Sequence, residues 1–107
     1  MNSQYKKGVL DLCVLSMLLQ EDRYGYDISE YLSKRIEIAD GTVYPLLRKL
    51  RNDGYVTTYL SEESNGPPRK YYSITESGRA LYRRERAEWL AFIKAVEKLL
   101  SWEGENE

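Results

Sequence analysis

Most of the chain repeats its apolar residues with the spacing of an α-helix, and one stretch in the middle repeats them with the spacing of a β-strand. The first helix is predicted from Lys6 to Leu19, where apolar residues occupy nearly every position. A helix with so full an apolar coat must be buried on more than one side, which a single small domain can scarcely provide. We therefore expect a second chain to cover part of this helix.

Two shorter amphipathic helices follow, joined by a brief connection. The first of them is predicted from Arg23 to about Arg35, and its apolar residues recur at positions i, i+4, i+7 and i+8. They are Tyr24, Ile28, Tyr31 and Leu32. A pair of short helices of this kind, the second with a polar outer side, is a candidate helix-turn-helix.

The second helix of the pair is predicted over residues 40–52, with Asp40 as a cap and Pro45 near its start, where a missing N–H costs little. Its apolar side consists of Val43, Leu46, Leu47 and Leu50. Its polar side suits phosphates and base edges in a DNA major groove, although many solvated surface helices have the same pattern. The polar residues are Tyr44, Arg48, Lys49, Arg51 and Asn52.

The apolar period changes to two after Gly54, a residue that can adopt the left-handed conformation that ends a helix. Residues 55–60 and 70–75 are aromatic and β-branched and predict two paired strands. Between them, residues 61–68 are rich in turn-forming residues. This part of the chain therefore predicts a hairpin with a long tip.

Arg69 and Lys70 stand where the tip rejoins the hairpin. We expect both cations beside the helix of residues 40–52, where they would add to its positive charge. A structural alternative is that they keep an edge strand from pairing with other chains.

A long helix is predicted over residues 76–102, with Thr75 as its N-cap. At a rise of about 1.5 Å per residue, residues 76–101 would be about 39 Å long, more than so small a domain needs. Its apolar residues follow a heptad-like spacing, which predicts pairing with another chain; the alternative is that the helix folds back over its own domain. With Leu12 of the first helix, the expected dimer interface consists of Tyr82, Trp89, Phe92, Val96 and Leu99.

The order of these elements predicts a fold that is mainly α with a small β-hairpin: a winged helix-turn-helix with a long C-terminal dimerisation helix. We expect residues 1–75 to form the DNA-binding domain and residues 76–102 the dimerisation helix. Residues 103–107 are acidic, and we expect them to be disordered.

The net charge of −1 argues against a basic footprint over the whole protein, but the charge is unevenly distributed. Residues 40–86 contain nine basic and six acidic side chains, whereas residues 87–107 contain two basic and five acidic ones. The positive charge thus coincides with the candidate helix-turn-helix and hairpin. Ten tyrosines in a chain of 107 residues are typical of surfaces that are half buried and half polar, as at interfaces.

Catalytic and metal-binding residues are scarce. The one cysteine, Cys13, lies in the apolar run of the first helix, where we expect a core residue rather than part of a disulfide or a metal site. The chain has no histidine, which removes the usual general base. Glu62 and Glu63 lie in the turn-rich tip without a partner base. We therefore expect neither an enzyme nor a bound metal or cofactor.

Lys6 and Lys7 before an apolar run have some likeness to a secretory signal. Asp11 interrupts the run, which is too short to cross a bilayer, and no small-residue cleavage site follows it. We therefore expect a cytoplasmic protein that does not bind membranes.

Several separated segments of this chain, in the right order, resemble the PadR family of bacterial transcriptional regulators. They read Asp-Gly-Thr-Val-Tyr-Pro-Leu-Leu-Arg-Lys-Leu at residues 40–50, Asp-Gly-Tyr-Val at 53–56, Gly-Pro-Pro-Arg-Lys-Tyr-Tyr at 66–72 and Ile-Thr-Glu-Ser-Gly at 74–78. Tyr24-Gly25-Tyr26 is also similar to the family. The resemblance extends from Lys6 to about Leu100, and the single terminal helix is similar to the short branch of the family.

The resemblance implies a homodimeric, usually repressing, DNA-binding protein whose wing contacts DNA beside the recognition helix. Some members of the short branch bind flat aromatic effectors at the dimer interface, with a tryptophan of the terminal helix stacked on the ligand. Trp89 falls at about that position, which makes it a candidate effector-binding residue. Plain packing at the interface is the alternative role for this side chain.

Together these patterns predict that two copies set their recognition helices into successive major grooves of an inverted repeat. Arg48 and Asn52 are the expected base readers, because arginine pairs with guanine and asparagine with adenine. The expected phosphate contacts are Thr42, Tyr44, Lys49, Arg51, Arg69 and Lys70. The near-neutral charge and the tyrosines leave one alternative, a winged-helix protein-interaction module without specific DNA binding.

Overall fold

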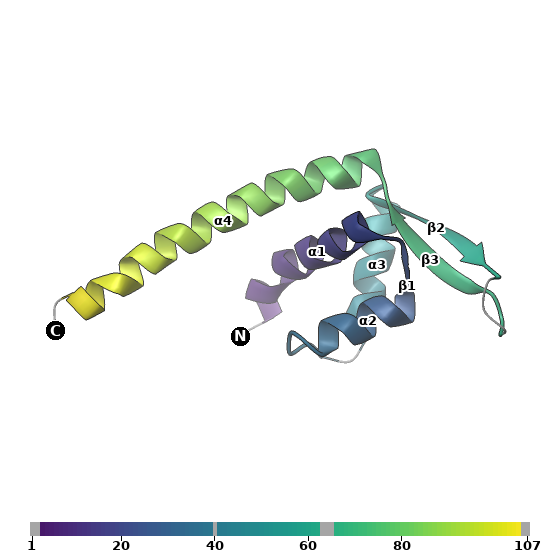
Figure 1. Cartoon of the computed structure of the whole chain (residues 1–107), viewed down its shortest axis with the longest axis horizontal. Helices are drawn as coiled ribbons and strands as arrows, with labels where there is room; N and C mark the ends of the chain where they lie inside the picture. Colours follow the sequence, from purple (N-terminus) through teal and green to yellow (C-terminus); the bar gives the residue numbers. More distant parts are fainter. Residues whose placement is uncertain (1–2, 40, 63–65, 106–107) are drawn as a thin grey trace.

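The computed structural model describes residues 3–39, 41–62 and 66–105, and within them it has four helices and three strands (Figure 1). In chain order they are α1 (Ser3–Gln20), β1 (Arg23–Tyr24), α2 (Gly25–Ser33), α3 (Val43–Asn52), β2 (Val56–Ser61), β3 (Arg69–Ile74) and α4 (Glu76–Glu105). α2 and α3 form the helix-turn-helix, β2 and β3 form the wing, and α4 extends away from the body. The expected fold, a mainly α winged helix-turn-helix with a small hairpin, is confirmed.

The wing belongs to a three-stranded antiparallel sheet in the order β1-β3-β2, and β1 places Tyr24 opposite Tyr71 of β3. The prediction that Arg23 and Tyr24 belong to a helix is wrong. Tyr24 has the extended backbone of a strand (φ −87°, ψ 159°), and α2 starts only at Gly25. The cause is non-local, because the edge of β3 away from β2 has backbone groups that need partners, and β1 supplies some of them.

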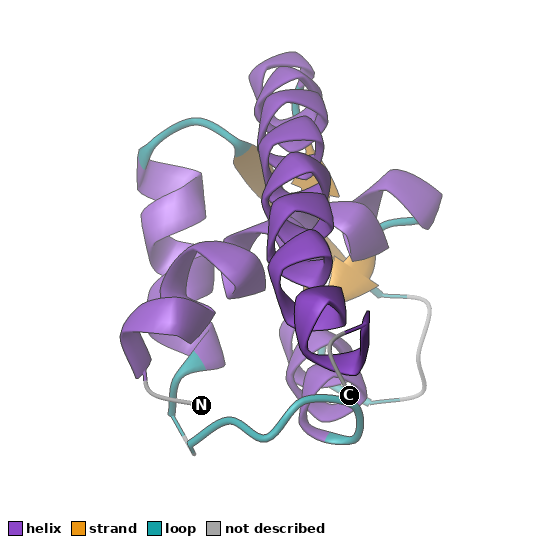
Figure 2. Cartoon of the chain, turned by 90° about the vertical axis from the view of Figure 1, so that its left-hand side faces the viewer, coloured by secondary structure: helices purple, strands orange, loops and turns teal. Residues whose placement is uncertain are grey.

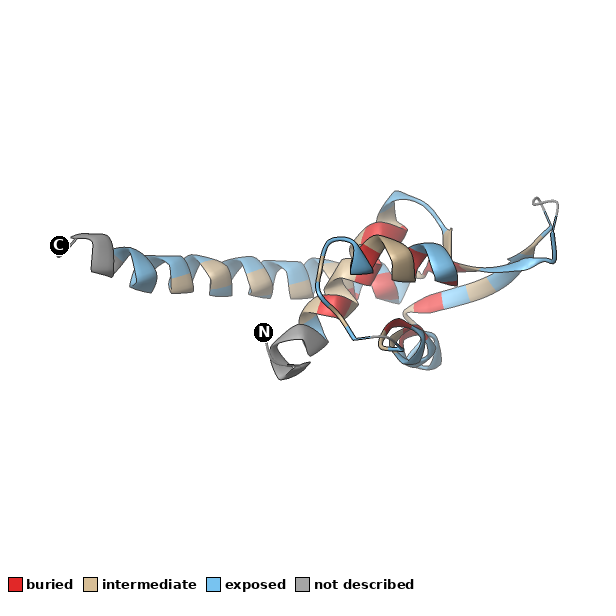
Figure 3. Ribbon diagram, turned by 90° about the horizontal axis from the view of Figure 1, so that it is seen from below, coloured by how far each residue is buried: buried red, intermediate tan, exposed pale blue. Residues whose placement is uncertain are grey.

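The core lies where α1, α2, α3 and the inner face of the sheet meet (Figure 3, red). The apolar sides predicted for the two short helices are confirmed apart from Tyr24, with Tyr31 and Leu46 half-buried at the edge of the core. Cys13 also packs against the core, and burial raises the pKa of its thiol. The buried residues of the core are Val14, Leu15, Met17, Leu18, Ile28, Leu32, Val43, Leu47, Leu50, Val56, Tyr72, Ile74 and Leu81.

α3 begins at Val43, with Thr42 in the cap position but without a side-chain hydrogen bond to the helix. The predicted cap, Asp40, lies outside the described residues. Pro45 is the third residue of the helix, so its missing N–H falls in the first turn, where backbone N–H groups have no partner within the helix.

α3 ends in a Schellman motif, as the glycine in its sequence predicts. Gly54 adopts φ +82°, which is favourable only for glycine. Its N–H donates to the carbonyl oxygen of Arg51 (3.0 Å), and the N–H of Tyr55 donates to that of Leu50 (2.9 Å). The chain therefore turns directly from α3 into β2.

The start of α4 is fastened to this same turn. The hydroxyl of Thr75 accepts a hydrogen bond from the N–H of Gly78 (3.0 Å), which confirms Thr75 as the N-cap. The hydroxyls of Thr75 and Ser77 both donate to the carbonyl oxygen of Gly54, at 2.7 and 3.0 Å. Hydrogen bonds to Gly54 thus hold the end of α3 and the start of α4 together.

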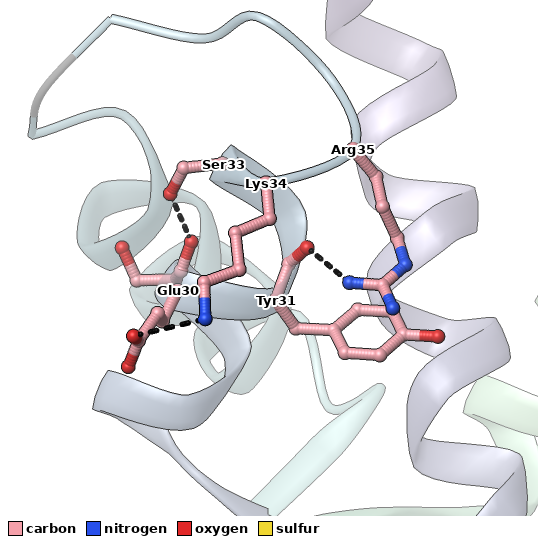
Figure 4. A network of polar contacts seen from close by, with 6 residues as sticks. Glu30, Tyr31, Ser33, Lys34 and Arg35 are labelled. Carbon is pink, nitrogen blue, oxygen red and sulfur yellow. Dashed lines mark hydrogen bonds and ion pairs between the residues drawn. The ribbon is translucent and has the colours of Figure 1, made fainter.

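α2 ends in a group of local polar contacts (Figure 4). Nζ of Lys34 lies 3.3 Å from Oε1 of Glu30. The guanidinium of Arg35 stacks on the ring of Tyr31, 3.6 Å from its centroid, and donates to the Tyr31 carbonyl oxygen at 3.2 Å. Both cations stand at the C-terminal end of the helix, where they complement its dipole, and α2 ends slightly earlier than predicted.

α4 is a helix of 30 residues, about 45 Å long, and it gives the molecule its shape. α1 packs along the first half of α4, while the distal half projects beyond the body (Figures 1 and 2). The molecule measures 60 × 28 × 21 Å. Residues 103–105 belong to this helix rather than to the disordered tail that was predicted, and residues 106–107 lie outside the described part. Across the described residues, no helix combines the length and apolar character needed to span a membrane.

Candidate nucleic-acid interface

The side of α3 that points away from the core is polar and exposed. The described residues place no carboxylate in ion-pair contact with its three cations. Their charge is therefore available to an anionic partner, and phosphate is the anion that such exposed arginines and lysines bind along DNA. The exposed residues are Tyr44, Arg48, Lys49, Arg51 and Asn52, whereas Thr42 is half-buried at the start of the helix.

Tyr72 of β3 lies beneath this polar side. Burial raises the pKa of its hydroxyl, the nearby guanidiniums of Arg51 and Arg48 oppose that rise, and Tyr44 adds to it. These charge effects are consistent with a phenol that is buried in the core and lies near the cations of α3.

The two wing cations lie on opposite faces of the sheet. Both are exposed, but side chains alternate along a strand, so Arg69 stands on the outer face of the sheet and Lys70 on the inner face, toward α3. The Cζ atom of Arg69 lies 4.6 Å from the ring centroid of Tyr24 in β1. Arg69 therefore packs on β1, a strand that the sequence did not predict.

A row of neighbouring tyrosine rings that sequence reasoning missed runs along the outer face of the sheet and continues to Tyr26 in α2. The ring centroids of Tyr59 and Tyr71 are 5.7 Å apart, those of Tyr71 and Tyr24 are 5.9 Å apart, and those of Tyr24 and Tyr26 are 6.1 Å apart. The hydroxyl of Tyr59 donates to the carboxylate of Asp22 at 2.7 Å. The predicted hairpin placed Tyr59 and Tyr71 on paired strands, but Tyr24 could join them only once β1 was known.

Most of the expected dimer residues lie along α4. Tyr82 packs against the core of its own chain, and Val96 is half-buried. The side chains farther along are open: Phe92 is 57% and Leu99 is 75% exposed. The distal half of α4 therefore presents large apolar side chains that its own chain does not cover (Figure 3).

Trp89 lines an open groove of about 350 Å³ between α1 and α4. Its ring centroid is 5.9 Å from that of Phe92, and Leu12 of α1 faces them across the groove. Two carboxylates, Glu85 and Glu88, also line the groove. Two expected interface residues of α4 and the one expected from α1 thus meet at one place.

The fold, with an exposed cationic helix and a wing beside it, is that of a winged helix-turn-helix DNA-binding regulator. The family of PadR-like transcriptional regulators matches residues 14–84, and the chain belongs to this family. The family consists of DNA-binding transcription regulators rather than enzymes.

Solved structures and other bacterial proteins are similar to this chain. A PadR-like transcriptional regulator of Bacillus cereus strain ATCC 14579 is 36% identical, with a TM-score of 0.83 over 92% of this chain and 97% of that one. A PadR family transcription regulator of Clostridium difficile R20291 is 31% identical, with a TM-score of 0.77 over 85% and 97%. The negative transcriptional regulator PadR of Bacillus subtilis strain 168 is 28% identical over 77% of this chain, which spans 45% of that relative.

Proposed function

We propose that this PadR-like regulator is a homodimeric repressor that binds an inverted-repeat operator. The observation that carries the proposal is the exposed polar side of α3, whose arginines, lysine and asparagine stand on a rigid helix without acidic partners among the described residues. Such side chains reach base edges and phosphates in a major groove. The name of the Bacillus subtilis relative, a negative regulator, supports repression.

A second copy is the partner that fits α4. Large apolar side chains that stay exposed on a helix usually mark an interface, and Phe92, Leu99 and Leu100 are 57%, 75% and 66% exposed. They continue the seam that begins with the half-buried Trp89. In a dimer paired through α4 and α1, the two recognition helices would lie about 34 Å apart and fit two half-sites one helical turn apart.

Two groups of side chains would divide the work on DNA. Arg48 and Asn52 are proposed to read base edges. The proposed phosphate contacts are Thr42, Tyr44, Lys49, Arg51, Arg69 and Lys70. If a dimer makes on the order of 6 to 10 phosphate contacts, its affinity should fall about 10³- to 10⁵-fold between about 50 and 200 mM salt.

The experiment that tests this function is selection of bound fragments from the host genome, followed by titration of the recovered DNA at several salt concentrations. We expect fragments that share an inverted repeat and a steep loss of affinity with salt. Salt-insensitive binding, or recovery of no common sequence, would overturn the proposal and favour the protein-interaction alternative.

Effector control is a further part of the proposal. The groove at Trp89 combines two aromatic rings with Glu85 and Glu88, so a planar cation is the ligand class that it fits best. Such a ligand would regulate DNA binding only if it favoured one separation of the two recognition helices over another.

Tryptophan fluorescence tests the effector site. Trp102 is the other tryptophan of the chain. A planar cationic dye should quench the tryptophan fluorescence of the unmodified protein and of Trp102→Ala, but not that of Trp89→Ala. An anionic dye of similar size is the matched control and should have little effect. Equal quenching of both variants would show that the dye does not bind at Trp89.

A further inference from the structure

Gly25, the first residue of α2, is buried, and its backbone conformation does not require a glycine, since its φ is not positive. The requirement comes from space. A Cβ atom at this position would lie 3.0 Å from Cε1 of Tyr44 and 3.6 Å from Cε1 of Tyr72. The ring of Tyr44, which comes from α3, therefore rests directly on the backbone of α2.

Tyr24, the preceding residue, makes the corresponding contact with the wing. The guanidinium of Arg69 lies over its ring, with Cζ 4.6 Å from the centroid. The ring itself is held in place by its cross-strand neighbour Tyr71, 5.9 Å away. Two consecutive residues thus contact one side chain of α3 and one of the wing.

We propose that Tyr24 and Gly25 form a positioning junction that sets Tyr44 of α3 and Arg69 of the wing in place for contact with DNA phosphates. This inference rests on the proposed DNA-binding function. Long side chains lose rotamer freedom when they bind, and a side chain already held in its bound orientation loses less. Tyr44 is 47% exposed and would otherwise be free to turn away from α2.

The stability and the DNA affinity of Gly25→Ala together distinguish the junction from a purely structural role for Gly25. Alanine favours a helix more than glycine does, and a half-exposed ring can give way by a few tenths of an ångström, so Gly25→Ala should fold with unchanged or higher stability. The junction requires that DNA affinity falls all the same. Stability and affinity should therefore separate in this one variant.

The first test is a double-mutant cycle on Gly25 and Tyr44, with affinity measured by fluorescence anisotropy on a random-sequence duplex of about 30 base pairs, long enough for two successive half-sites. Gly25→Ala should weaken binding about 3- to 10-fold, in the range found for residues in contact. In the Tyr44→Ala background the same change should have no further effect. Combined with Arg69→Ala, its effect should remain in full.

The second cycle tests the other half of the junction. Tyr24→Leu should weaken DNA binding when Arg69 is present, but it should have no effect in the Arg69→Ala background. Tyr24→Phe is the matched control, because it keeps the aromatic face that holds the guanidinium and should retain full affinity. An equal loss for Leu and Phe would contradict the contact with Arg69.

A measurement without DNA separates this inference from the proposed function. In the NMR spectrum an Hα proton of Gly25 should have a chemical shift displaced by the ring current of Tyr44, and this contribution should disappear in Tyr44→Ala. If the unmodified protein binds no duplex, the proposed function is overturned and the junction with it. Two results would overturn only the junction in a protein that does bind DNA. Either Gly25→Ala keeps full DNA affinity, or Gly25→Ala lowers the affinity by the same factor in the Tyr44→Ala background as in the unmodified protein.

Discussion

Arg48 and Arg69 carry the same charge in different settings. Arg48 stands on the exposed side of α3, close to the hydroxyl of Tyr72. Arg69 lies on the outer face of the sheet over the ring of Tyr24. A helix that enters a groove brings its side chains to base edges, whereas a wing beside the groove meets the phosphate backbone.

These settings predict different effects of removing each arginine. Arg48→Ala should narrow the difference in binding free energy between operator and random DNA by about 1–3 kcal/mol for each half-site, because the proposed bidentate contact to guanine is lost. Arg69→Ala should weaken both DNAs alike and lower the salt dependence by about two units of slope, one for each copy in the dimer. Titrating each variant with both duplexes at several salt concentrations checks this. Full discrimination by Arg48→Ala would show that another residue reads the bases.

The local sequence pattern predicts those helices and strands that are long enough to show a periodic spacing of apolar residues. The buried Ile28 and Leu32 of α2 and Val43 of α3 follow from helical spacing, and the end of α3 follows from Gly54. β1 could not be predicted in this way, since two residues show no period and their pairing depends on the open edge of β3, far along the chain.

The candidate site shows the same limit. The polar side of α3 followed from the sequence, because a helix fixes which residues share a side. Neighbouring residues of a strand always lie on opposite faces, but that Arg69 rather than Lys70 takes the outer face did not follow, because it depends on how β3 joins the sheet. The contacts of Tyr44 with Gly25 and of Arg69 with Tyr24 join residues about 20 to 45 positions apart, beyond the reach of any helical or strand period.

The close packing around Gly78, at the start of α4, predicts an effect on stability. A Cβ atom at Gly78 would lie 2.2 Å from the carbonyl oxygen of Tyr55 and 2.8 Å from Cγ1 of Ile74, so the backbone would have to move. Gly78→Ala should cost about 1–3 kcal/mol, as overpacking of a close contact usually does. For a domain of this size that corresponds to a fall in Tm of about 4–20 °C.

Thermal unfolding at equal protein concentration measures the effect of Gly78→Ala. The matched control is Gly66→Ala in the wing, where an added Cβ would have no atom within 4 Å, so Tm should stay the same. If both variants unfolded at the temperature of the unmodified protein, the start of α4 would not be packed as closely against Tyr55 and Ile74 as the structure has it.

On the scale of the whole molecule, the chain is a compact body with a projecting arm. Its radius of gyration is 16.6 Å, whereas a compact chain of this length should have about 13 Å. The difference comes from the distal half of α4, which projects beyond the body and whose described side chains are mostly exposed (Figures 1 and 3). A helix of this kind gains little by itself, because helices in proteins owe most of their stability to an apolar face that packs.

Leu99 offers the sharpest test of what that arm does. It is 75% exposed in the single chain, so Leu99→Glu should leave the fold of the body intact while placing a charge in the proposed interface. Sedimentation should then show a monomer. Affinity for the inverted repeat should fall about 10²- to 10⁴-fold, because the second half-site is no longer bound through a linked partner.

Ala87→Glu is the matched control, since Ala87 is also exposed on α4 but lies on the side opposite the apolar seam. It adds the same charge and should remain dimeric with full affinity. A Leu99→Glu protein that stayed dimeric and kept its affinity would place the interface elsewhere, and the two recognition helices would then need another means of reaching two half-sites. A monomer that still bound the inverted repeat at full strength would instead show that one copy suffices, and the twofold operator would be wrong.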